Sequence, residues 1–533
     1  MNNQRALHEQ KQNNGKTYLI GGGIASLAAA AFLIRDADVR GQDIVVVEAL
    51  DRLGGSLDGA GSPQDGYVLR GGRMIESKYL CTFGLFSSIP TLDGSKTVTE
   101  EIFDWNRVIQ TDSKSRLVRN GHRVDGPDFG LSEQHILTLE RVSLEPESML
   151  GRSTIADQFA DSFFQTNFWL MWCTTFAFQP WHSVVEFRRY LLRFAHMVSG
   201  FNHLHGIMRT VYNQYDSLVL PLRKWLEERG VGFRLNTRVS EIHTSEEAGR
   251  KFVDRILYSR GGEEGEINLA EGDRVIVTIG SMTDSSSLGS MDAAPVPDDR
   301  PGPAWQLWEK MAKGKPEFGK PAVFAGDIQK SKWVSFTTTQ SDDTFFRAVR
   351  DFTGNIPGEG GLITFADSAW LLSIVLPHQP HFIGQPEGVN VFWGYGLSVD
   401  KPGNFVNKPM SACTGREIMT EVLGQLGLAA RCPEILPASI CIPCMMPFIT
   451  SQFLPRAKGD RPEVIPEGWT NLALVGQFCE IPDDVVFTVE YSIRAAQLAV
   501  YQLFGIRQEP PAVYKGQYDP RVLYKALKAL HDI

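Results

Sequence analysis

The first fifty residues place apolar and polar positions in the order of a nucleotide-binding fold. An apolar run at 17–20 leads into three glycines at 21–23 and then into an alanine-rich helical segment, Leu27 to Ile34. Residues 43–47 form a second strand-like segment, apolar from Ile44 to Val47, and Glu48 ends it. A dinucleotide-binding βαβ unit has the same order of elements: a strand, a glycine turn, a helix, and a second strand that ends in an acid. The pattern therefore predicts a Rossmann-like α/β fold.

Several residues of this unit have predicted roles toward a dinucleotide. Gly21 would make the tight turn, and Gly23 would let the backbone approach a pyrophosphate at the helix N-terminus. Glu48 would accept hydrogen bonds from ribose hydroxyls. Ser26 stands where the motif usually has its third glycine, and serine is small enough for the helix to pack closely on the strand. The expected cofactor contacts in this unit are Gly21, Gly23, Ile24, Ala25, Ser26 and Glu48.

Further glycines and a late strand indicate that the nucleotide is FAD. The segment 51–56, DRLGGS, follows the acid-ended strand as in the two-dinucleotide flavoproteins, not as in NAD dehydrogenases. Near the C-terminus a strand at 471–475 is followed by Gly476-Gln477 and by a helix from Val489 to Leu503, a unit that returns to the flavin in such proteins. The other expected FAD contacts are Arg52, Gly55, Ser56, Gly71, Gly72, Arg73, Ser281 and Gln477.

Inserted substrate-binding and helical regions interrupt the predicted FAD domain. Their aromatic and mixed helix–strand patterns differ from the compact βαβ signals that flank them. The predicted parts are a polar N-terminal tail (1–16), a discontinuous FAD-binding domain (17–90, 205–290 and 465–505), a substrate-binding domain (91–150 and 291–464), an aromatic helical insertion (151–204) and an amphipathic C-terminal tail (506–533).

Composition narrows the class of protein. Hydrophobic residues make up 43% and charged residues 22% of the chain, as in ordinary globular proteins. The net charge of −9 gives no reason to expect a nucleic-acid partner. The longest apolar stretch, Ile24 to Ile34, is too short to span a bilayer, and seven cysteines do not form a disulfide framework. We therefore expect a cytoplasmic protein. His182, His378 and His381 lack metal-ligand spacing, so we expect no metal site.

Aromatic side chains crowd residues 163–181. They could form a helical core or domain interface, or a tunnel for an acyl chain, because each buried methylene contributes about 0.8 kcal/mol. A helix predicted from Ser183 to Val198 places Phe187 and Tyr190 on one apolar face. By itself, a tyrosine in such a position is more often a core residue whose hydroxyl is hydrogen-bonded.

Long stretches of the chain together resemble one family, the FAD-dependent oleate hydratases, also called myosin-cross-reactive antigens. The matches run from residue 18 to about residue 500. They include GGGIASLAAAAFLIRDA, GGSLDGAGSPQDGYVLRGGR, NFWLMWCTTFAFQPWHS, YNQYDSLVLPL, FWGYGL, PFITSQFLPRAKGDRPEVIP and VGQFCEIPDDVVFTVEYSIRAA.

The resemblance implies an activity and a set of site residues. The family adds water across the cis-9 double bond of a long-chain unsaturated fatty acid, converting oleate to a 10-hydroxy acid, and FAD there has a non-redox role. The resemblance places the proton-donating tyrosine at Tyr190. It places the residues that hold the substrate carboxylate at Gln214, Thr450, Gln452 and Arg456. Family members are often homodimers.

The chain departs from the family pattern at one catalytic position. The usual motif RGGRE-M-E reads RGGRMIE over residues 70–76, so Met74 replaces the glutamate that orients or deprotonates water. Methionine cannot accept a proton, and a positioned base contributes about 10²–10⁴-fold, so the enzyme should be slower. Three interpretations are open. Other groups hold the water while Tyr190 protonates the alkene, or Glu76 takes over, or the chain keeps only flavin and lipid binding.

Two other functions and one surface feature complete the predictions. The chain could be an FAD-dependent oxidoreductase acting on a lipophilic substrate, or a fatty-acid-binding flavoprotein without catalysis. The segment Asp519 to Ile533 carries apolar residues at helical spacing with basic residues among them. It is either a docked surface helix or a peripheral helix at the inner face of the membrane, because basic amphipathic helices lie at interfaces.

Overall fold

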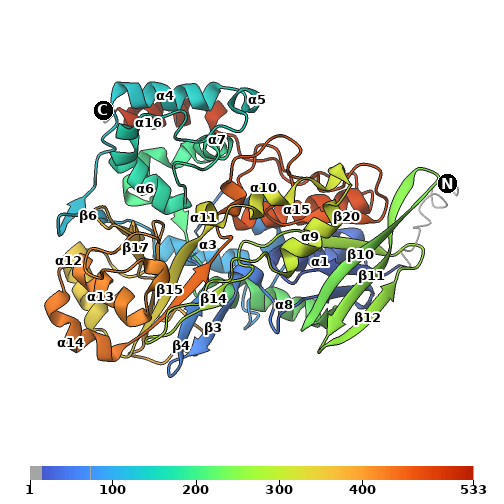
Figure 1. Cartoon of the computed structure of the whole chain (residues 1–533), viewed down its shortest axis with the longest axis horizontal. Coiled ribbons are helices and arrows are strands. Elements are labelled where there is room, and N and C mark those ends of the chain that lie inside the picture. The colour runs from blue at the N-terminus through green and yellow to red at the C-terminus, as the bar shows by residue number, and fades with distance from the viewer. Residues whose placement is uncertain (1–14, 73, 532–533) are drawn as a thin grey trace.

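The computed structural model describes residues 15–72 and 74–531 (Figure 1). The predicted cofactor residue Arg73 and nearly all of the predicted polar tail lie outside the described residues. Two sheets stand side by side, and a group of helices lies above them at the upper left of the view (Figure 1). None of the helices in the described part is long and apolar enough to cross a bilayer.

A parallel five-stranded sheet carries the predicted βαβ unit. Its strands lie in the order β20-β13-β1-β2-β9, and all but the half-buried edge strand β9 read as short apolar runs, as buried parallel strands do. The helix α1 (Ile24–Ala37) is three residues longer at each end than predicted, and it packs against α15 (Val489–Leu503), whose bounds match the prediction. The strands are β1 (Thr17–Ile20), β2 (Ile44–Val47), β9 (Gly232–Arg234), β13 (Arg274–Thr278) and β20 (Leu472–Val475).

The second sheet has eight strands and is antiparallel except at β16–β6. The hairpin β3 (Gly59–Ser62) and β4 (Gly66–Leu69) packs on it, because backbone amides of β4 donate to threonine hydroxyls of β15 at 2.8 and 2.9 Å. In sheet order its strands are β14 (Ser287–Leu288), β19 (Ser439–Met446), β15 (Trp333–Gln340), β18 (Asn390–Gly396), β17 (Leu372–Val375), β16 (Leu362–Phe365), β6 (Ser115–Arg119) and β7 (His122–Asp125).

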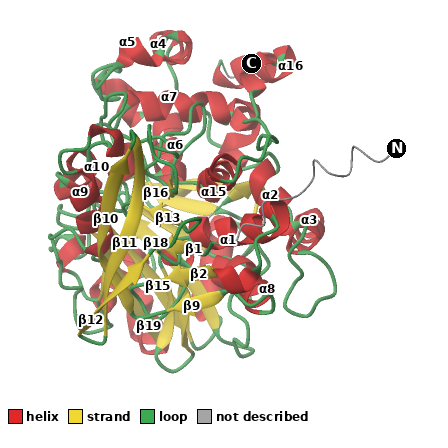
Figure 2. Cartoon of the chain, turned by 90° about the vertical axis from the view of Figure 1, so that its right-hand side faces the viewer, coloured by secondary structure: helices red, strands yellow, loops and turns green. Residues whose placement is uncertain are grey.

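Helices of the aromatic segment and of the C-terminus lie together above the sheets (Figure 2). Helix α7 (Val184–Arg193) starts where predicted, because Ser183 accepts a hydrogen bond from the amide of Glu186. The helix predicted to reach Val198 is wrong at its end: the chain continues as 3₁₀ turns over Ala195–His203, a common ending for an α-helix. The other helices here are α4 (Glu133–Leu144), α5 (Glu147–Leu150), α6 (Asn167–Phe176) and α16 (Pro520–Leu530).

The remaining elements connect these layers. Two very short strands, β5 and β8, pair with each other, and β10, β11 and β12 form a separate antiparallel sheet. Their bounds are β5 (Ile75–Glu76), β8 (Ile207–Met208), β10 (Thr237–Glu247), β11 (Arg250–Arg260), β12 (Glu263–Asn268), α2 (Leu80–Phe86), α3 (Val98–Val108), α8 (Leu220–Glu227), α9 (Pro303–Ala312), α10 (Pro321–Ala325), α11 (Ile328–Ser331), α12 (Thr344–Thr353), α13 (Gly415–Gln425) and α14 (Cys432–Ile435).

Candidate active site

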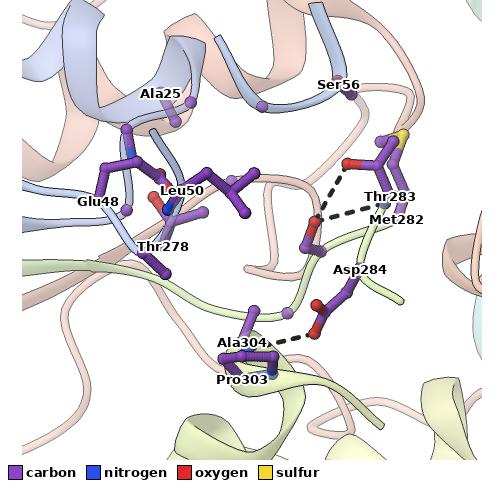
Figure 3. Close-up of a pocket in the computed structure, with 18 of the residues that line it drawn as sticks. Ala25, Glu48, Leu50, Ser56, Thr278, Met282, Thr283, Asp284, Pro303 and Ala304 are labelled. Atoms are coloured by element: carbon purple, nitrogen blue, oxygen red, sulfur yellow. Dashed lines mark hydrogen bonds between the residues drawn. The ribbon is translucent and has the colours of Figure 1, made fainter. Parts of the chain in front are cut away.

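A cavity of about 310 Å³ opens at the carboxyl ends of β1, β2, β13 and β20. This is the place where parallel α/β sheets bind nucleotides. Glu48 and Leu50 lie on one side of it, and Met282, Thr283 and Asp284 lie on the other (Figure 3). The position and size of this cavity make it the candidate nucleotide site.

The glycine turn shapes one wall of this nucleotide cavity. Gly21 has φ of +98°, and a Cβ there would lie 3.1 Å from Cβ of Thr278. Both the backbone conformation and the close contact therefore disfavour a side chain at this position. A Cβ on Gly23 would meet no protein atom within 4 Å, so the space beside it is open. Gly23 begins α1 without a side-chain cap, and the first turn holds no acidic residue. The free amides at this helix end suit a phosphate.

Glu48 is held so that its carboxylate faces this wall. One oxygen accepts a hydrogen bond from the amide of Gly22 at 2.5 Å, and the other accepts from the amide of Leu50 at 2.8 Å. Burial raises the pKa of Glu48. A carboxylate has about four acceptor positions, so two backbone bonds leave acceptor capacity for the hydroxyls of a ribose.

The opposite wall comes from the loop after β13. The Ser281 hydroxyl accepts from the amide of Thr283 at 3.3 Å, and a carboxylate oxygen of Asp284 accepts from the amide of Ala304 at 3.2 Å (Figure 3). Burial raises the pKa of Asp284. The sequence favours the whole loop as a neighbour of phosphate or flavin, because it follows the end of a parallel strand, and it singles out Ser281 as the contact. The structure adds Thr283 and Asp284 to the lining.

The structure brings most of the predicted cofactor residues to the nucleotide cavity. Ser26 lies behind it, with its hydroxyl 3.0 Å from that of Thr278, where it joins α1 to β13. Arg52 does not line the cavity, and its guanidinium lies 3.7 Å from Asp51 at the surface. The predicted residues that line it are Gly21, Gly23, Ile24, Ala25, Glu48, Gly55, Ser56, Ser281 and Gln477.

A second, smaller cavity of about 50 Å³ lies beyond the same chain segment. Arg70 lines the nucleotide cavity, whereas Gly71, Gly72 and Met74 line the second one, so this segment borders both. Gln214, predicted to hold the substrate, lines the second cavity together with Met74. We call this space the Met74 cavity.

Glu76 is buried among charged groups outside both cavities. One carboxylate oxygen lies 2.8 Å from Nη1 of Arg193, and the other accepts from the amide of Lys78 at 2.6 Å and lies 3.5 Å from Nε2 of His196. Burial raises the pKa of Glu76, but the hydrogen bond to His196 and the charge of Arg193 outweigh it, and the net pKa lies below the usual value. The carboxylate therefore serves as the partner of a buried arginine.

Tyr190 lies on α7 within the aromatic cluster. Its ring centroid is 5.0 Å from that of Phe176 and 5.0 Å from that of Phe178. Its hydroxyl donates to the backbone carbonyl of Val486. The next residue, Phe487, donates its amide to the side chain of Gln477, which lines the nucleotide cavity. One loop thus separates Tyr190 from that cavity.

The other three predicted substrate residues line neither of the two cavities. The Thr450 hydroxyl donates to the carbonyl of Ser331 at 3.0 Å, and the Gln452 amide donates to the carbonyl of Ile449 at 3.1 Å. The guanidinium of Arg456 pairs with two acids, Nε at 2.8 Å from Glu186 and Nη1 at 3.0 Å from Glu480, and its Nη2 is buried without a hydrogen-bond partner among the described residues. Gln214 is therefore the one of the four that lines a cavity with Met74.

One group of potential metal ligands lies outside the linings of both cavities. Ligand atoms of Asp112, His203 and His205 all lie within 4.8 Å of one another. A ring nitrogen of His205 is 3.0 Å from the Asp112 carboxylate, and one of His203 is 2.9 Å from the carbonyl of Ser113. Hydrogen bonds within the protein already account for these positions.

Fold and site together define a Rossmann-like, dinucleotide-binding α/β protein, as the sequence predicts. Two solved structures share the fold. Cyclohexylamine oxidase from Brevibacterium oxydans IH-35A has a TM-score of 0.55 and 13% identity, and the match covers 92% of this chain and 99% of that one. An oxidoreductase from Methanosarcina mazei has a TM-score of 0.53 and 13% identity, over 91% of this chain and 100% of that one. At such identities the likeness concerns the fold alone.

Sequence similarity identifies the family. The profile of the MCRA family matches residues 14–501, and the chain belongs to this family. It is 39% identical to an oleate hydratase of Streptococcus pyogenes serotype M49 (strain NZ131) over 527 residues, which cover 97% of this chain and 89% of that one. It is 33% identical to a linoleate hydratase of Lactiplantibacillus plantarum over 564 residues, and the match covers 97% of this chain and 98% of that one. The family resemblance stated from the sequence is confirmed.

Proposed function

We propose that this protein is a fatty-acid double-bond hydratase, a hydro-lyase that adds water to cis-9 unsaturated fatty acids such as oleate. The observation that carries the proposal is the match to two hydratases over nearly the whole chain. The structure adds a nucleotide cavity and a second cavity on either side of the segment from Arg70 to Met74. A cofactor and a substrate could therefore meet at that segment.

FAD is the cofactor that fits the nucleotide cavity. The uncapped N-terminus of α1 would hold the pyrophosphate, Glu48 would hold a ribose, and Ser281 and Gln477 would contact the opposite side. Hydration involves no net redox change, so bound FAD would supply a fixed charge distribution next to the substrate. The protein's own groups have to move the protons.

Tyr190 is the proposed proton donor to the alkene. One alkene carbon takes the proton, and the other takes the oxygen of water. The proton that this oxygen then loses passes to solvent, and the tyrosinate regains one, so the net change is the addition of one water. A phenol with a pKa near 10 is a weak acid, so the site has to stabilise the cationic carbon that develops. The Tyr190 hydroxyl first has to release the carbonyl of Val486. Phe487 has φ of +67°, an unfavourable value for a bulky residue, which makes this loop a suitable element to move.

Water activation in this chain has to differ from that in family members with a glutamate. The thioether of Met74 accepts no proton. Glu76 is a weak base because its pKa lies below the usual value, and its oxygens already bind Arg193 and Lys78. We therefore favour water held by the backbone or by other side chains near Met74, while Tyr190 protonates the alkene.

Gln214 is the strongest candidate for a contact with the substrate, because it lines a cavity together with Met74. Thr450, Gln452 and Arg456 remain proposed contacts. The Thr450 hydroxyl and the Gln452 amide would have to exchange an existing hydrogen bond for the ligand. Arg456 could offer its Nη2, which has no partner among the described residues, and keep its ion pairs with Glu186 and Glu480.

Isotope-labelled hydration of oleate tests the proposal. FAD-loaded protein in H₂¹⁸O should yield a product heavier by one labelled water, and Tyr190→Phe should abolish it. Absence of labelled product from the folded, FAD-loaded wild type would overturn the proposal. The change to Met74 favours one second candidate, a fatty-acid-binding flavoprotein without catalysis. That protein would bind oleate without forming product, whereas an oxidoreductase would bleach the flavin during turnover.

A homodimer and a peripheral contact with the inner face of the membrane are the finer parts of the proposal. Apolar side chains on α16 are exposed, with Leu523 at 41%, Tyr524 at 68% and Leu527 at 42%. Lysines 525 and 528 lie on the same helix. This combination supports a contact with an anionic surface. Light scattering at several protein concentrations would test the dimer.

A further inference from the structure

Arg209 is a cation in the wall of the Met74 cavity for which the described part of the chain supplies no counter-ion. Its Nε and Nη2 atoms are closed to solvent and have no hydrogen-bond partner among the described residues. Burial lowers the pKa of Arg209 to about 10, with no acidic group acting in the opposite direction. A charge in this state is costly unless something pairs with it.

Other arginines inside this protein have partners. Arg193 lies 2.8 Å from Glu76. Arg116, which has no acid beside it, donates to the carbonyl of Phe201 at 2.7 Å and to a threonine hydroxyl at 2.9 Å. The guanidinium of Arg209 differs from these, because it lies at a cavity wall with two of its nitrogens unpaired. Its partner therefore has to come from outside the chain.

The strand register connects Arg209 with Met74. Strands β5 and β8 are antiparallel, with Ile75 opposite Met208. The same register, extended by one residue, sets Met74 opposite Arg209. Side chains of directly opposed residues share a face, and both of these residues line the same cavity.

The substitution at Met74 therefore leaves this cavity with an unbalanced positive charge. The family resemblance implies a glutamate here, which would supply Arg209 with a counter-charge and the water with a proton acceptor. Methionine supplies neither. The proposed hydration brings the attacking water, and with it the alkene carbon that becomes positive, to the same cavity. An unpaired guanidinium in its wall opposes the charge on that carbon, because like charges repel.

Two histidines are the other ionisable groups of the lining, and neither replaces the glutamate. Burial lowers the pKa of His378 and that of His381, the latter to about 3, and the charge of Arg209 acts on His381 in the same direction. Neutral imidazoles do not balance a guanidinium. A proton taken from water by either ring would add a second positive charge to the cavity.

The Met74 cavity has room for a small anion beside one water. Its volume of about 50 Å³ is about three to five times the 10–15 Å³ that a single water needs. Formate has three heavy atoms, so formate and one water fit this space together. Trp105, Trp393 and Val375 supply nonpolar walls, which leaves the guanidinium as the charged group that would bind the anion.

We propose that Arg209 binds a small carboxylate, formate or acetate, in the Met74 cavity and that this anion accepts the proton of the attacking water, an inference that rests on the proposed function. A guanidinium and a carboxylate match in geometry and can form two parallel hydrogen bonds. The oxygen of water forms its bond to the cationic carbon while its proton moves to a carboxylate oxygen. The resulting acid releases the proton to solvent and Tyr190 regains one, so the anion is recovered and one water is added.

Saturation-transfer NMR on FAD-loaded protein without oleate measures the binding step by itself. Formate has a single proton on carbon, so its signal reports binding directly. Arg209→Gln should bind formate about 10-fold or more weakly than wild type, the loss expected for a hydrogen bond between charged groups. Arg209→Lys, which keeps the charge without the planar fork, should retain part of the binding. Equal formate affinity in folded Arg209→Gln and in wild type would overturn the inference.

Hydration of oleate at increasing formate concentration measures the catalytic step. Sodium gluconate keeps the ionic strength constant, because gluconate is too large for the cavity. The kcat of wild type should rise saturably by about 10-fold, less than for a tethered base, because pairing with Arg209 lowers the pKa of the anion. No rise, or an equal rise with chloride, would overturn the proton-accepting role, because chloride is too weak a base. Acetate, larger by one methyl group, shows which of the two carboxylates the cavity admits.

Three further variants sharpen the test. Met74→Glu should lose the formate signal and the rate gain, because its own carboxylate pairs with Arg209. Met74→Leu keeps an apolar side chain of similar size and should retain both. Arg107→Gln removes an exposed arginine of α3 outside both cavities and should leave the formate signal unchanged. A rate gain that persists in Arg209→Gln would place formate elsewhere and overturn the inference.

The inference and the proposed function can fail separately. Formate binding that depends on Arg209, without labelled hydration product, would refute the hydratase and keep the anion site. Labelled product whose rate of formation does not respond to formate, from a protein that shows no formate signal, would refute the anion site and keep the hydratase. Thermal unfolding of each variant shows that the data come from folded protein.

Discussion

Met74 is the residue at which this chain can be compared most directly with its family. Met74→Glu should raise kcat for oleate hydration by about 10²-fold, the lower end of the range for a positioned base. The gain stays at the lower end because Arg209, opposite in the strand register, would lower the pKa of the new carboxylate and make it a weaker base. Steady-state kinetics with oleate measures the change in kcat.

Met74→Gln is the matched control for this prediction. It places a polar side chain of the same size at the same position without a base or a charge. Its KM should stay near the wild-type value and its kcat should rise little. Equal kcat gains from both variants would mean that polarity at this position, not proton acceptance, limits the rate.

Helix α7 is joined to the loop at 456–461 by a buried ion cluster. Glu186 of α7 is fully buried, 2.8 Å from Arg456 and 3.0 Å from Arg461. Burial raises the pKa of Glu186, but the two arginines outweigh it and lower the pKa from 4.5 to about 2. Glu186→Gln should lower the free energy of unfolding by about 3–5 kcal/mol, because the arginines lose their shared partner. Denaturant unfolding at pH 7 measures this.

The stabilisation that this ion cluster gives to α7 should depend on pH. The folded-state pKa of Glu186 lies below the unfolded-state value, so the unfolded state binds more protons as the pH falls. The stabilisation is complete above about pH 4.5 and is lost toward pH 2. The variant should therefore approach wild-type stability in acid. Glu227→Gln, which breaks an exposed pair with Arg223, should change stability by less than about 1 kcal/mol at any pH.

Helix α16 carries the prediction of a membrane contact. Changing Leu523 and Leu527 to serine together should reduce co-sedimentation with anionic vesicles about tenfold or more, since both side chains are exposed and apolar. Val108→Ser removes an exposed apolar side chain from α3, at 77% exposure, and should have no effect. Equal sedimentation of the double variant and wild type would contradict the peripheral contact and favour a docked surface helix.

Elements with a strong local signal were predictable from the sequence, and elements defined by distant pairing were not. The strand, glycine turn, helix and acid at 17–48 could be read locally because each has its own residue pattern. The strands β5 and β8 have two residues each, too few to show a period of two. Their pairing joins positions more than a hundred residues apart, so the juxtaposition of Met74 and Arg209 needed the structure.

Cofactor binding should stabilise the molecule as a whole. The nucleotide cavity is built from residues between Ile20 and Ser492, in segments that only the fold brings together, so FAD would bind the folded state and not the unfolded chain. Free FAD at about 100 times its dissociation constant should therefore add about 2.7 kcal/mol to the free energy of unfolding. Thermal unfolding with increasing FAD measures this as a rising Tm.

Gly21→Ala tests whether the FAD-dependent rise in Tm comes from binding in the nucleotide cavity or from a general effect of flavin on the protein. The alanine is strained at a φ of +98°, and its Cβ would lie 3.1 Å from Thr278, so the turn that faces the nucleotide has to shift. The variant should show a smaller rise in Tm at each FAD concentration. Gly94→Ala, at φ of +72° but with no atom within 4 Å of its Cβ, carries a similar backbone strain outside the nucleotide cavity and should keep the full rise. Equal rises in wild type and Gly21→Ala would place FAD elsewhere, because a ligand that does not contact the glycine turn is insensitive to its shape.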